Sequence, residues 1–358
     1  MRNKPTIRTL ARRSEALLAC RTLEDLAGLL GVRPERILTL AANPQYREFE
    51  VPKKNGSMRQ IEDPVPPLKR LQDYLADFLQ AVYYFHRTPP AYGFMLRPVD
   101  DPEPRHVLSN AERHLGRPWL LNLDMQDFFH AVTVERVRQV LEAPLFGFPE
   151  EISVPLAQLT TYRGRLPMGA PSSPVLSNLA SIPLDQDLQD LADDRQWTYT
   201  RYADDMSFSA DRPFEPDALE RVAFIAETWG FQLNPDKNKL YGPGDRDKQV
   251  TGLLVGGHKV DLPDDYLPTL EAAIAHLSKV VDAQHLVSSG RNQPDSWVME
   301  LRRGVYGKLE FARHILGADH HWVSRLSGNY YDAIRPPEEY GALSWLEFGY
   351  DWDVNAGW

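Results

Sequence analysis

The stretch RYADDMSF, residues 201–208, predicts two short strands joined by a tight turn that carries two adjacent carboxylates. Side by side at the tip of a hairpin, Asp204 and Asp205 repel each other, and this repulsion would destabilise a turn that served only the fold. A divalent cation relieves the repulsion, and Mg²⁺ prefers carboxylate oxygens together with the phosphates of a substrate. Although turns favour Asp in general, the flanking strands favour a metal site here.

A second acidic stretch, LDMQDFF at residues 123–129, follows a predicted buried strand at residues 118–124. Two metal ions about 3.5–4 Å apart need carboxylates from different segments of the chain, and Asp124 would supply the third. Asp127 could be a fourth ligand, but a helix cap or a salt bridge is the favoured role. Phe129 could be an ordinary core residue, or it could form a wall beneath the sugar of an incoming nucleotide.

The remaining pattern of the chain mixes helices and strands. Helices are predicted at residues 7–42, 67–84, 174–194, 214–229 and 264–334, and strands at residues 46–62, 118–124, 197–210, 233–240 and 250–255, with a hairpin turn at Asn55-Gly56. This order predicts an α+β fold rather than a doubly wound sheet. The leucines between residues 23 and 30 could belong to a DNA-binding helix-turn-helix, but small core helices are favoured.

The composition is that of an ordinary globular protein: 358 residues, 42% of them hydrophobic and 25% charged. The one cysteine, Cys20, excludes an internal disulfide and leaves too few thiols for a Cys/His zinc cluster. Neither a targeting peptide nor a membrane segment is visible in the sequence. Together these features predict a cytoplasmic protein.

The net charge of −10 argues against a protein that binds nucleic acid. The charge is uneven, because residues 1–72 hold 14 Lys and Arg against 8 Asp and Glu. Residues 336–358, by contrast, hold five acidic residues and no Lys or Arg. Since nucleic acid needs a local basic track and not a basic whole, a nucleic-acid enzyme remains compatible with this charge.

Together the two acidic stretches resemble those of the reverse transcriptase family. Residues 202–205 match its Tyr-x-Asp-Asp box, and Asp124 with the two phenylalanines that follow matches its first acidic box. Three more stretches are similar to further boxes of the family, in the family's order. They are KKNGSMR at residues 53–59 (the finger hairpin that holds the triphosphate), LPMGAPSSP at residues 166–174 (the Leu-Pro-Gln-Gly box), and Gly230 with Asn234 and Lys237. The resemblance spans roughly residues 44–258.

One residue departs from the family's pattern, because Met168 stands where the family usually has Gln. A thioether cannot make the hydrogen bonds of an amide, which puts template or nucleotide contacts at this position in doubt. The neighbouring Gly169 can still admit the close approach of another backbone.

Two short signatures narrow the resemblance to retron reverse transcriptases. NAERH at residues 110–114 is similar to their Asn-Ala-x-x-His signature, and VTG at residues 250–252 is similar to their Val-Thr-Gly signature. Asn110 and His114 could instead be polar groups that cap a helix. The resemblance implies a cognate structured non-coding RNA as template and as primer, through an internal 2′-hydroxyl, and a branched RNA–DNA product. It also implies antiphage defence with a separate effector protein.

The resemblance implies roles for individual residues as well. Asp124, Asp204 and Asp205 would be catalytic and would hold two Mg²⁺ ions, with the backbone carbonyl of Met125 as a further ligand. The nucleotide-binding residues would be Lys53, Lys54, Arg59, Phe129, Met168, Gly169 and Lys237, and the RNA-binding residues would be Asn110, His114, Val250, Thr251, Gly252, Arg302, Arg303 and Lys308. The basic hairpin residues could instead be a solvated tip, and Lys237 could be either a proton donor to pyrophosphate or a surface lysine.

The implied architecture is a right-hand polymerase with an antiparallel palm sheet and a helical thumb. Its expected parts are an N-terminal helical segment (1–43), fingers with a retron-specific insertion (44–115), a palm (116–258, with part of the fingers near 138–165), an RNA-binding thumb (259–335) and an acidic aromatic tail (336–358). Expected partners are the RNA, its cDNA product, deoxynucleoside triphosphates and the effector, with no membrane. The tail could pack on the body or dock the effector.

Three other functions stay open. The chain could be a bacterial defence reverse transcriptase that needs no retron RNA. A group II intron maturase is less favoured, since there is no room for a DNA-binding or endonuclease extension. The alternative from a different class is a non-catalytic RNA-binding scaffold of the same fold.

Overall fold

The computed structural model describes residues 4–52, 56–287 and 296–335. Lys53 and Lys54 lie outside the described residues, as does the acidic tail at residues 336–358. The chain divides into two compact units, Met1–Thr251 and Gly252–Trp358, here called the N-terminal and the C-terminal unit. The boundary between them falls a few residues before residue 258, the end of the palm expected from the sequence.

Three short helices open the N-terminal unit, as the sequence predicts: α1 (Ile7–Leu18), α2 (Leu23–Leu30) and α3 (Pro34–Ala42). The side chain of Thr22 accepts a hydrogen bond from the backbone of Asp25 and completes a capping box at the start of α2. Gly31 ends the same helix in a left-handed conformation, with a φ of 67°. Leu26 and Leu30 are buried in the main hydrophobic core, which favours the prediction of core helices.

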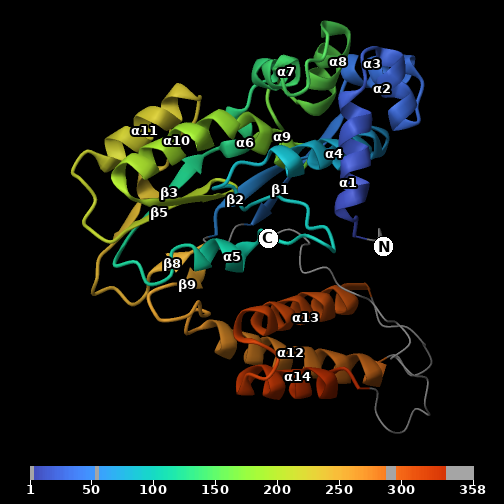
Figure 1. Ribbon diagram of the computed structural model, residues 1–358. Helices are drawn as coiled ribbons and strands as arrows, with labels where there is room; N and C mark the ends of the chain where they lie inside the picture. The colour runs from blue at the N-terminus through green and yellow to red at the C-terminus, as the bar shows by residue number, and fades with distance from the viewer. Residues whose placement is uncertain (1–3, 53–55, 288–295, 336–358) are drawn as a thin grey trace. The chain divides into compact units, whose positions relative to one another are not determined.

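An antiparallel sheet lies at the centre of the N-terminal unit (Figure 1). Its strands are β3 (Trp119–Gln126), β4 (Thr198–Tyr202), β5 (Asp205–Ala210), β6 (Gln232–Leu233) and β7 (Lys239–Tyr241). They follow the order β4-β5-β3-β6, and β7 also pairs with β3. The central strand β3 therefore meets three other strands, and the predicted α+β fold is confirmed.

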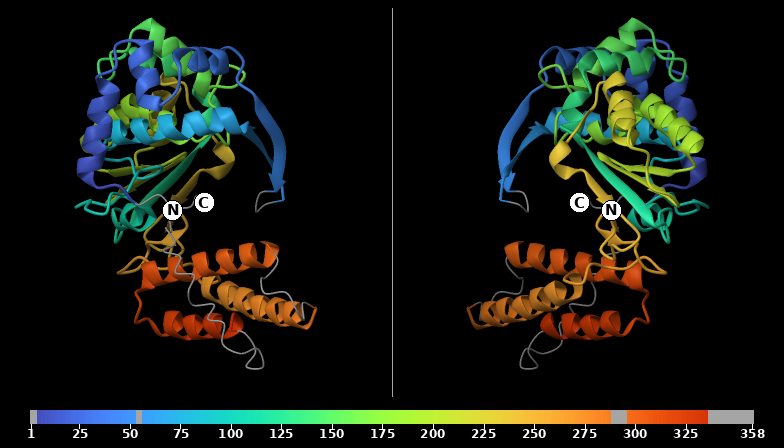
Figure 2. Two further views of the ribbon diagram at one scale, coloured as in Figure 1. Left: turned by 90° about the vertical axis from the view of Figure 1, so that its right-hand side faces the viewer. Right: turned by 90° about the vertical axis from the view of Figure 1, so that its left-hand side faces the viewer.

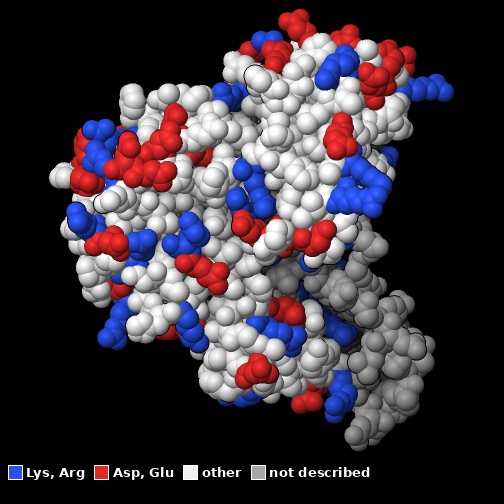
Figure 3. All heavy atoms as spheres, viewed as in Figure 1, with Lys and Arg blue, Asp and Glu red and all other residues white. Residues whose placement is uncertain are grey.

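Eight further helices belong to the described part of the N-terminal unit. They are α4 (Pro66–His86), α5 (Val107–Glu112), α6 (Phe128–Ala131), α7 (Val134–Glu142), α8 (Glu150–Thr160), α9 (Ser173–Ala180), α10 (Ile182–Arg195) and α11 (Ala218–Thr228). Of these, α10 packs on β4 and α11 packs on β6. Helix α10 also carries four exposed acids, at positions 187, 190, 193 and 194. Acidic side chains gather over this part of the surface in Figure 3, so the net negative charge is unevenly placed.

The single long helix predicted at residues 174–194 is wrong in one respect. The chain breaks at Ser181 into α9 and α10. Pro183 stands in the first turn of α10, and it has no N–H to donate to the carbonyl four residues earlier. The helix therefore ends at Ala180 and starts again at Ile182.

The finger hairpin consists of β1 (Tyr46–Pro52) and β2 (Met58–Pro64), paired antiparallel from Tyr46 opposite Pro64 to Pro52 opposite Met58. Figure 2 shows this hairpin extending away from the helices of the N-terminal unit. Most of β1 is exposed, whereas the last residues of β2 are buried. The base of the hairpin is thus anchored while its outer part faces solvent.

The last part of the N-terminal unit contains a short 3-10 helix, η1 (Pro235–Lys237), and β8 (Gln249–Val250). The C-terminal unit begins with β9 (Leu253–Leu254) and continues as α12 (Tyr266–Val287), α13 (Ser296–Leu316) and α14 (His321–Ala333). The three helices bury Leu270, Leu277, Leu309 and Leu326 among them. Phe311 packs on Tyr266, and Tyr306 packs on Tyr330. Phe311 and Tyr306 therefore contribute to the packing of the three helices. Among the described residues, no helix is long and apolar enough to cross a membrane.

A close backbone contact joins the segment before α5 to the β4–β5 turn. A Cβ atom added at Gly93 would lie 2.4 Å from the backbone nitrogen of Ala203. No real Cβ contact is so short, and the neighbouring atoms belong to rigid backbone. Only glycine therefore allows these two segments to touch.

We predict that Gly93→Ala lowers the free energy of unfolding by about 1–3 kcal/mol, because the added methyl group must push two backbone segments apart. Gly28→Ala is the matched control. Gly28 lies inside α2, and an added Cβ there meets no described atom within 4 Å. This control should stabilise the protein by about 0.5–1 kcal/mol. Chemical denaturation of both variants checks the prediction, and equal stabilities would contradict it.

Candidate active site

The three predicted acidic residues lie at one end of the central sheet. In the register of β3 and β5, Asp124 stands directly opposite Asp205. The backbone N–H of Met125 donates a hydrogen bond of 3.0 Å to the carbonyl of Asp204, which ties the β4–β5 turn to β3. Strand pairing therefore brings together acids that lie about 80 residues apart in the sequence.

These acids carry more negative charge than their surroundings balance. Asp205 keeps part of its surface open, yet desolvation, followed by the charges of Asp204 and Asp124, raises the pKa of its carboxyl to about 7. Burial and the charge of Asp124 also raise the pKa of Asp204, against the lowering effect of Lys237 and Arg59. A shift of this direction in neighbouring acids is typical of a site that a cation completes.

Lys237 is the group that faces Asp124. Its Nζ lies 2.9 and 2.8 Å from the two carboxylate oxygens of Asp124, and the backbone N–H of Asn234 donates to the Asp124 carbonyl at 2.8 Å. Burial lowers the pKa of the Lys237 ammonium, but the hydrogen bond and the charge of Asp124 outweigh burial and raise it. The ammonium thus stands where a cation is expected, next to the acid.

The donor set fits Mg²⁺, since carboxylate oxygens are its preferred protein ligands. As placed, however, no three Asp, Glu, His or Cys side chains of the described residues are close enough together to hold one ion. A metal ion held by Asp124 would compete with the Lys237 ammonium for the same carboxylate. The metal role of these acids, and of the Met125 carbonyl, stays a prediction.

The predicted nucleotide-binding residues are placed as follows. Arg59 lies on the exposed part of β2, and its charge acts on Asp204. Phe129 is half-buried, with its ring centroid 5.7 Å from that of Phe94 and 5.8 Å from that of Phe128.

Asp127 occupies the N-cap position of α6 but makes no side-chain cap hydrogen bond within the described residues, so the predicted capping role is wrong.

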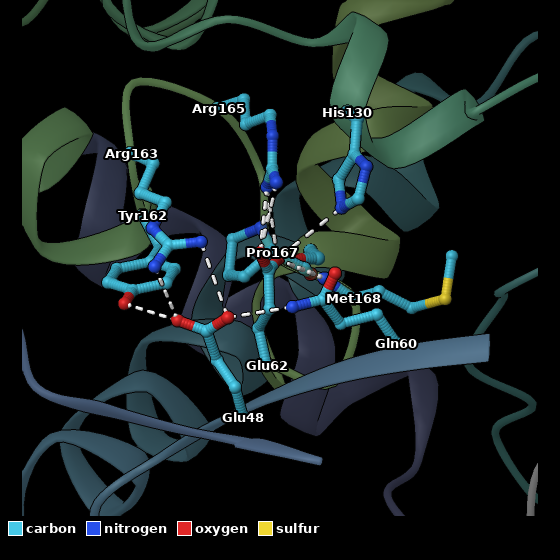
Figure 4. Close-up of polar contacts among 10 residues, drawn as sticks. Glu48, Gln60, Glu62, His130, Tyr162, Arg163, Arg165, Pro167 and Met168 are labelled. Carbon is cyan, nitrogen blue, oxygen red and sulfur yellow. Dashed lines mark hydrogen bonds and ion pairs between the residues drawn. The ribbon is translucent and has the colours of Figure 1, made fainter. Parts of the chain in front are cut away.

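Glu62 attaches the finger hairpin to the segment that contains Met168 (Figure 4). Its side chain is only 1% exposed and accepts hydrogen bonds of 3.0–3.1 Å from Arg165. His130 Nε2 lies 3.3 Å from the same carboxylate. The backbone of Met168 meets Glu62 twice: its N–H donates to the carboxylate at 3.3 Å, and its carbonyl accepts from the Glu62 N–H at 2.7 Å.

Glu48 makes a second, more exposed attachment on the neighbouring strand. It accepts hydrogen bonds from Tyr162 at 2.8 Å and Gln60 at 2.7 Å, and it pairs with Arg163 at 2.8 Å (Figure 4). Two carboxylates of the hairpin thus hold residues 162–168. Neither acid gave a signal in the sequence, because Glu on an alternating strand usually faces solvent.

The contact between Glu62 and residues 168–169 explains why a glycine stands at position 169. It also shows that the local fold depends little on the side chain of Met168. A Cβ at Gly169 would lie 2.9 Å from Ile61 Cγ2 and 3.0 Å from the Glu62 carbonyl, so the expected close backbone approach is confirmed. The Met168 thioether points away from the Glu62 carboxylate in Figure 4. Since main-chain atoms hold this position, Met in place of Gln leaves the segment anchored.

Asn110 and His114 are both buried, at 1% exposure. The His114 ring nitrogens lie 2.7 Å from Thr200 Oγ1 and 2.8 Å from Ser209 Oγ, which attaches the end of α5 to β4 and β5. Desolvation, with smaller effects of Arg113 and Arg117, lowers the pKa of His114 to about 3. The RNA-binding role of Asn110 and His114 stays a prediction. Because both side chains are buried, they would affect RNA binding by fixing the position of α5.

The other predicted RNA-binding residues fall on the unit boundary and on α13. Val250 is fully buried, while Thr251 and Gly252 form a turn with φ angles of 50° and 81°. On α13, Arg303 is exposed, and Arg302 and Lys308 are partly buried. Nothing in these positions tests their contact with RNA.

Comparison with known proteins matches the part of the chain that contains these acidic residues. Residues 51–255 match the family described as "Reverse transcriptase (RNA-dependent DNA polymerase)". "Retron Ec86 reverse transcriptase" of Escherichia coli is 32% identical over 77% of this chain and 84% of that protein. From Myxococcus xanthus, "Retron Mx65 reverse transcriptase" is 33% identical over 74% of this chain, and "Retron Mx162 reverse transcriptase" is 31% identical over 75%. The chain spans 65% and 61% of these two relatives.

His114 predicts a dependence of stability on pH. Its pKa falls from 6.5 to about 3 on folding, so the unfolded chain binds a proton that the folded chain excludes. The stability is complete above pH 6.5 and declines as the pH falls toward 3. Between pH of about 7.5 and about 5, this one group should remove about 2 kcal/mol. Chemical denaturation of wild type and His114→Gln at both values checks this, and parallel losses in the two proteins would contradict it.

Proposed function

Because this chain belongs to the reverse transcriptases, and among them to the retron type, we propose that it copies a cognate structured non-coding RNA into DNA, starting from an internal 2′-hydroxyl of that RNA. The enzyme is an RNA-directed DNA polymerase, and its family uses divalent metal ions. The observation that carries the proposal is the register of β3 and β5, which sets Asp124 opposite Asp205 beside the turn with Asp204. The product would be branched RNA–DNA made for antiphage defence.

The chain's own residues supply most of the proposed mechanism. When bound, two Mg²⁺ ions would make the primer hydroxyl more acidic and neutralise the phosphates of the nucleotide. Asp124, Asp204 and Asp205 would hold the ions, with the Met125 carbonyl as a further ligand. Lys237, released from Asp124, would then be free to donate a proton toward the leaving pyrophosphate.

Nucleotide binding would rest on the finger hairpin and on α6. Arg59 would bind phosphate oxygens with both arms of its guanidinium, beside Lys53 and Lys54. Phe129 would pack beneath the deoxyribose and exclude a ribose 2′-hydroxyl. Met168 and Gly169 would line the same site, where Met168 offers an apolar surface in place of an amide.

The partners follow from this proposal. RNA would contact the C-terminal unit through Arg302, Arg303 and Lys308, with further contributions from residues 250–252. Deoxynucleoside triphosphates, the cDNA product and a separate effector protein complete the set, in the cytoplasm. A bacterial defence reverse transcriptase without retron RNA is the nearest alternative, followed by the non-catalytic scaffold.

The double variant Asp204→Asn, Asp205→Asn should still bind RNA but make no DNA, because amides lack the charge that holds Mg²⁺. With a DNA primer annealed to an RNA oligonucleotide, we expect a loss of more than about 100-fold in primer extension. EDTA should abolish the wild-type reaction. Asp127→Asn, which changes an exposed acid near Asp124, is the matched control and should keep wild-type activity. Residual synthesis by the double variant would exclude the assigned metal site.

The retron assignment predicts a nucleic-acid product in cells. The gene is expressed with about a kilobase of its native flanking DNA, and total nucleic acid is separated by size. We expect a short single-stranded DNA whose mobility shifts after treatment with RNase and with a debranching enzyme. If that band is missing while the purified protein extends a primed RNA template, the enzyme is a reverse transcriptase of another kind. If both assays are silent in Mg²⁺, the scaffold alternative prevails.

A further inference from the structure

A fully buried ion pair lies directly behind the turn that carries Asp204 and Asp205. Arg201 and Asp185 are both 0% exposed, and the guanidinium contacts the carboxylate through Nε at 2.7 Å and through Nη2 at 2.7 Å. Asp185 comes from α10, and Arg201 is the residue before Tyr202 on β4. Two more donors, the hydroxyls of Thr88 at 2.7 Å and Tyr199 at 3.1 Å, complete the surroundings of Asp185.

The third guanidinium nitrogen of Arg201, Nη1, makes hydrogen bonds outside the ion pair with Asp185. This nitrogen donates to the carbonyl of Ala203 at 3.0 Å and to the side-chain oxygen of Asn178 at 3.0 Å. Ala203 adopts the left-handed conformation, with a φ of 59°, which is unfavourable for a residue with a Cβ. An unfavourable backbone conformation persists only where its surroundings fix it.

Other contacts hold the same turn from the segment before α5. The amide of Asn178 donates to the carbonyl of Gly93 at 2.9 Å. The backbone of Arg201 donates to Pro90 at 2.7 Å and accepts from Tyr92 at 2.8 Å. Arg201 therefore sits at the junction of α9, α10 and residues 88–93, with one arm extended to the turn.

The buried ion pair between Arg201 and Asp185 is expected to add little to the free energy of unfolding. Desolvating two charges offsets most of their attraction, and apolar residues of similar volume often serve the fold equally well. An apolar side chain cannot, however, donate to the Ala203 carbonyl. The feature that only Arg supplies is thus the fixed position of the turn.

We propose that Arg201 is a positioning residue for the metal-binding turn: Asp185 and Asn178 orient its guanidinium, which holds the Ala203 carbonyl and so sets where the carboxylates of Asp204 and Asp205 project. This inference rests on the metal role proposed for those two acids. Side chains behind a metal ligand set its orientation and thereby its affinity for the metal.

The test separates stability from positioning with two variants. Arg201→Met leaves the buried Asp185 carboxylate without its charge partner and with only the hydroxyls of Thr88 and Tyr199, which should lower both the denaturation temperature and the rate. Adding Asp185→Asn removes the unpaired charge, so the denaturation temperature should recover. The rate of adding one nucleotide to a DNA primer on an RNA template should stay about 100-fold below wild type. The Mg²⁺ concentration for half-maximal rate should stay about ten-fold higher than for wild type.

A conservative variant and a stability control complete the design. Arg201→Lys keeps the charge beside Asp185 but lacks the planar fork that reaches Ala203 as well. It should need more Mg²⁺ even at temperatures where it is fully folded. Ile152→Ala, a buried residue of α8, should lower the denaturation temperature without changing the Mg²⁺ requirement.

Three outcomes would overturn the inference. They are recovery of the rate together with stability in the double variant, a wild-type Mg²⁺ requirement in Arg201→Lys, and an equal shift in Ile152→Ala. If the double variant does not fold, Arg201→Lys decides alone. Activity in the Asp204→Asn, Asp205→Asn variant would instead remove the proposed metal site, and the two failures are thus distinguishable.

Discussion

The repulsion between acids on adjacent strands is the constraint around which the N-terminal unit is arranged. Directly opposite like charges weaken an antiparallel pair, yet β3 and β5 set Asp124 against Asp205. The rest of the same strands compensates, because Leu121, Leu123 and Phe208 are buried in one continuous core. Apolar packing thus fixes a register that the charges oppose, and the repulsion is concentrated at the end of the sheet where we propose the metal site.

Charge compensation takes two different forms in this molecule. Glu62 is closed off from solvent and bound by Arg165 and the Met168 backbone, so separating it would leave a buried charge without a partner. Asp124 faces Lys237, whose side chain is 59% exposed. An exposed ammonium can exchange its carboxylate partner for water with little change in free energy. The first pair therefore fixes the finger hairpin on residues 165–168, whereas the second leaves Asp124 with an exposed partner.

The sequence predicted those features that reside in short stretches. The hairpin with Asp204 and the strand before Asp124 follow from local pattern, because alternation and turn residues act over a few positions. The break at Ser181, the burial of His114 and the pairing of Arg201 with Asp185 did not follow from it. Each depends on segments far apart in the chain, and Arg before a strand end or His after a helix is compatible with an exposed role. The prediction of a cap at Asp127 is wrong for a local reason: the residue stands at the N-cap position of α6, but its backbone is left-handed and its side chain makes no cap hydrogen bond.

The contact between Gly93 and Ala203 also limits how this protein can diverge. Gly93 and the turn that carries Asp204 and Asp205 lie against each other with no space for a Cβ atom at residue 93, and Asn178 bridges Gly93 and Arg201. Neither segment can lengthen or change its path without the other. The two stretches therefore have to change together despite the hundred or so residues between them. A chimera that exchanges the region before α5 between relatives would have to carry α9 and the β4–β5 hairpin with it.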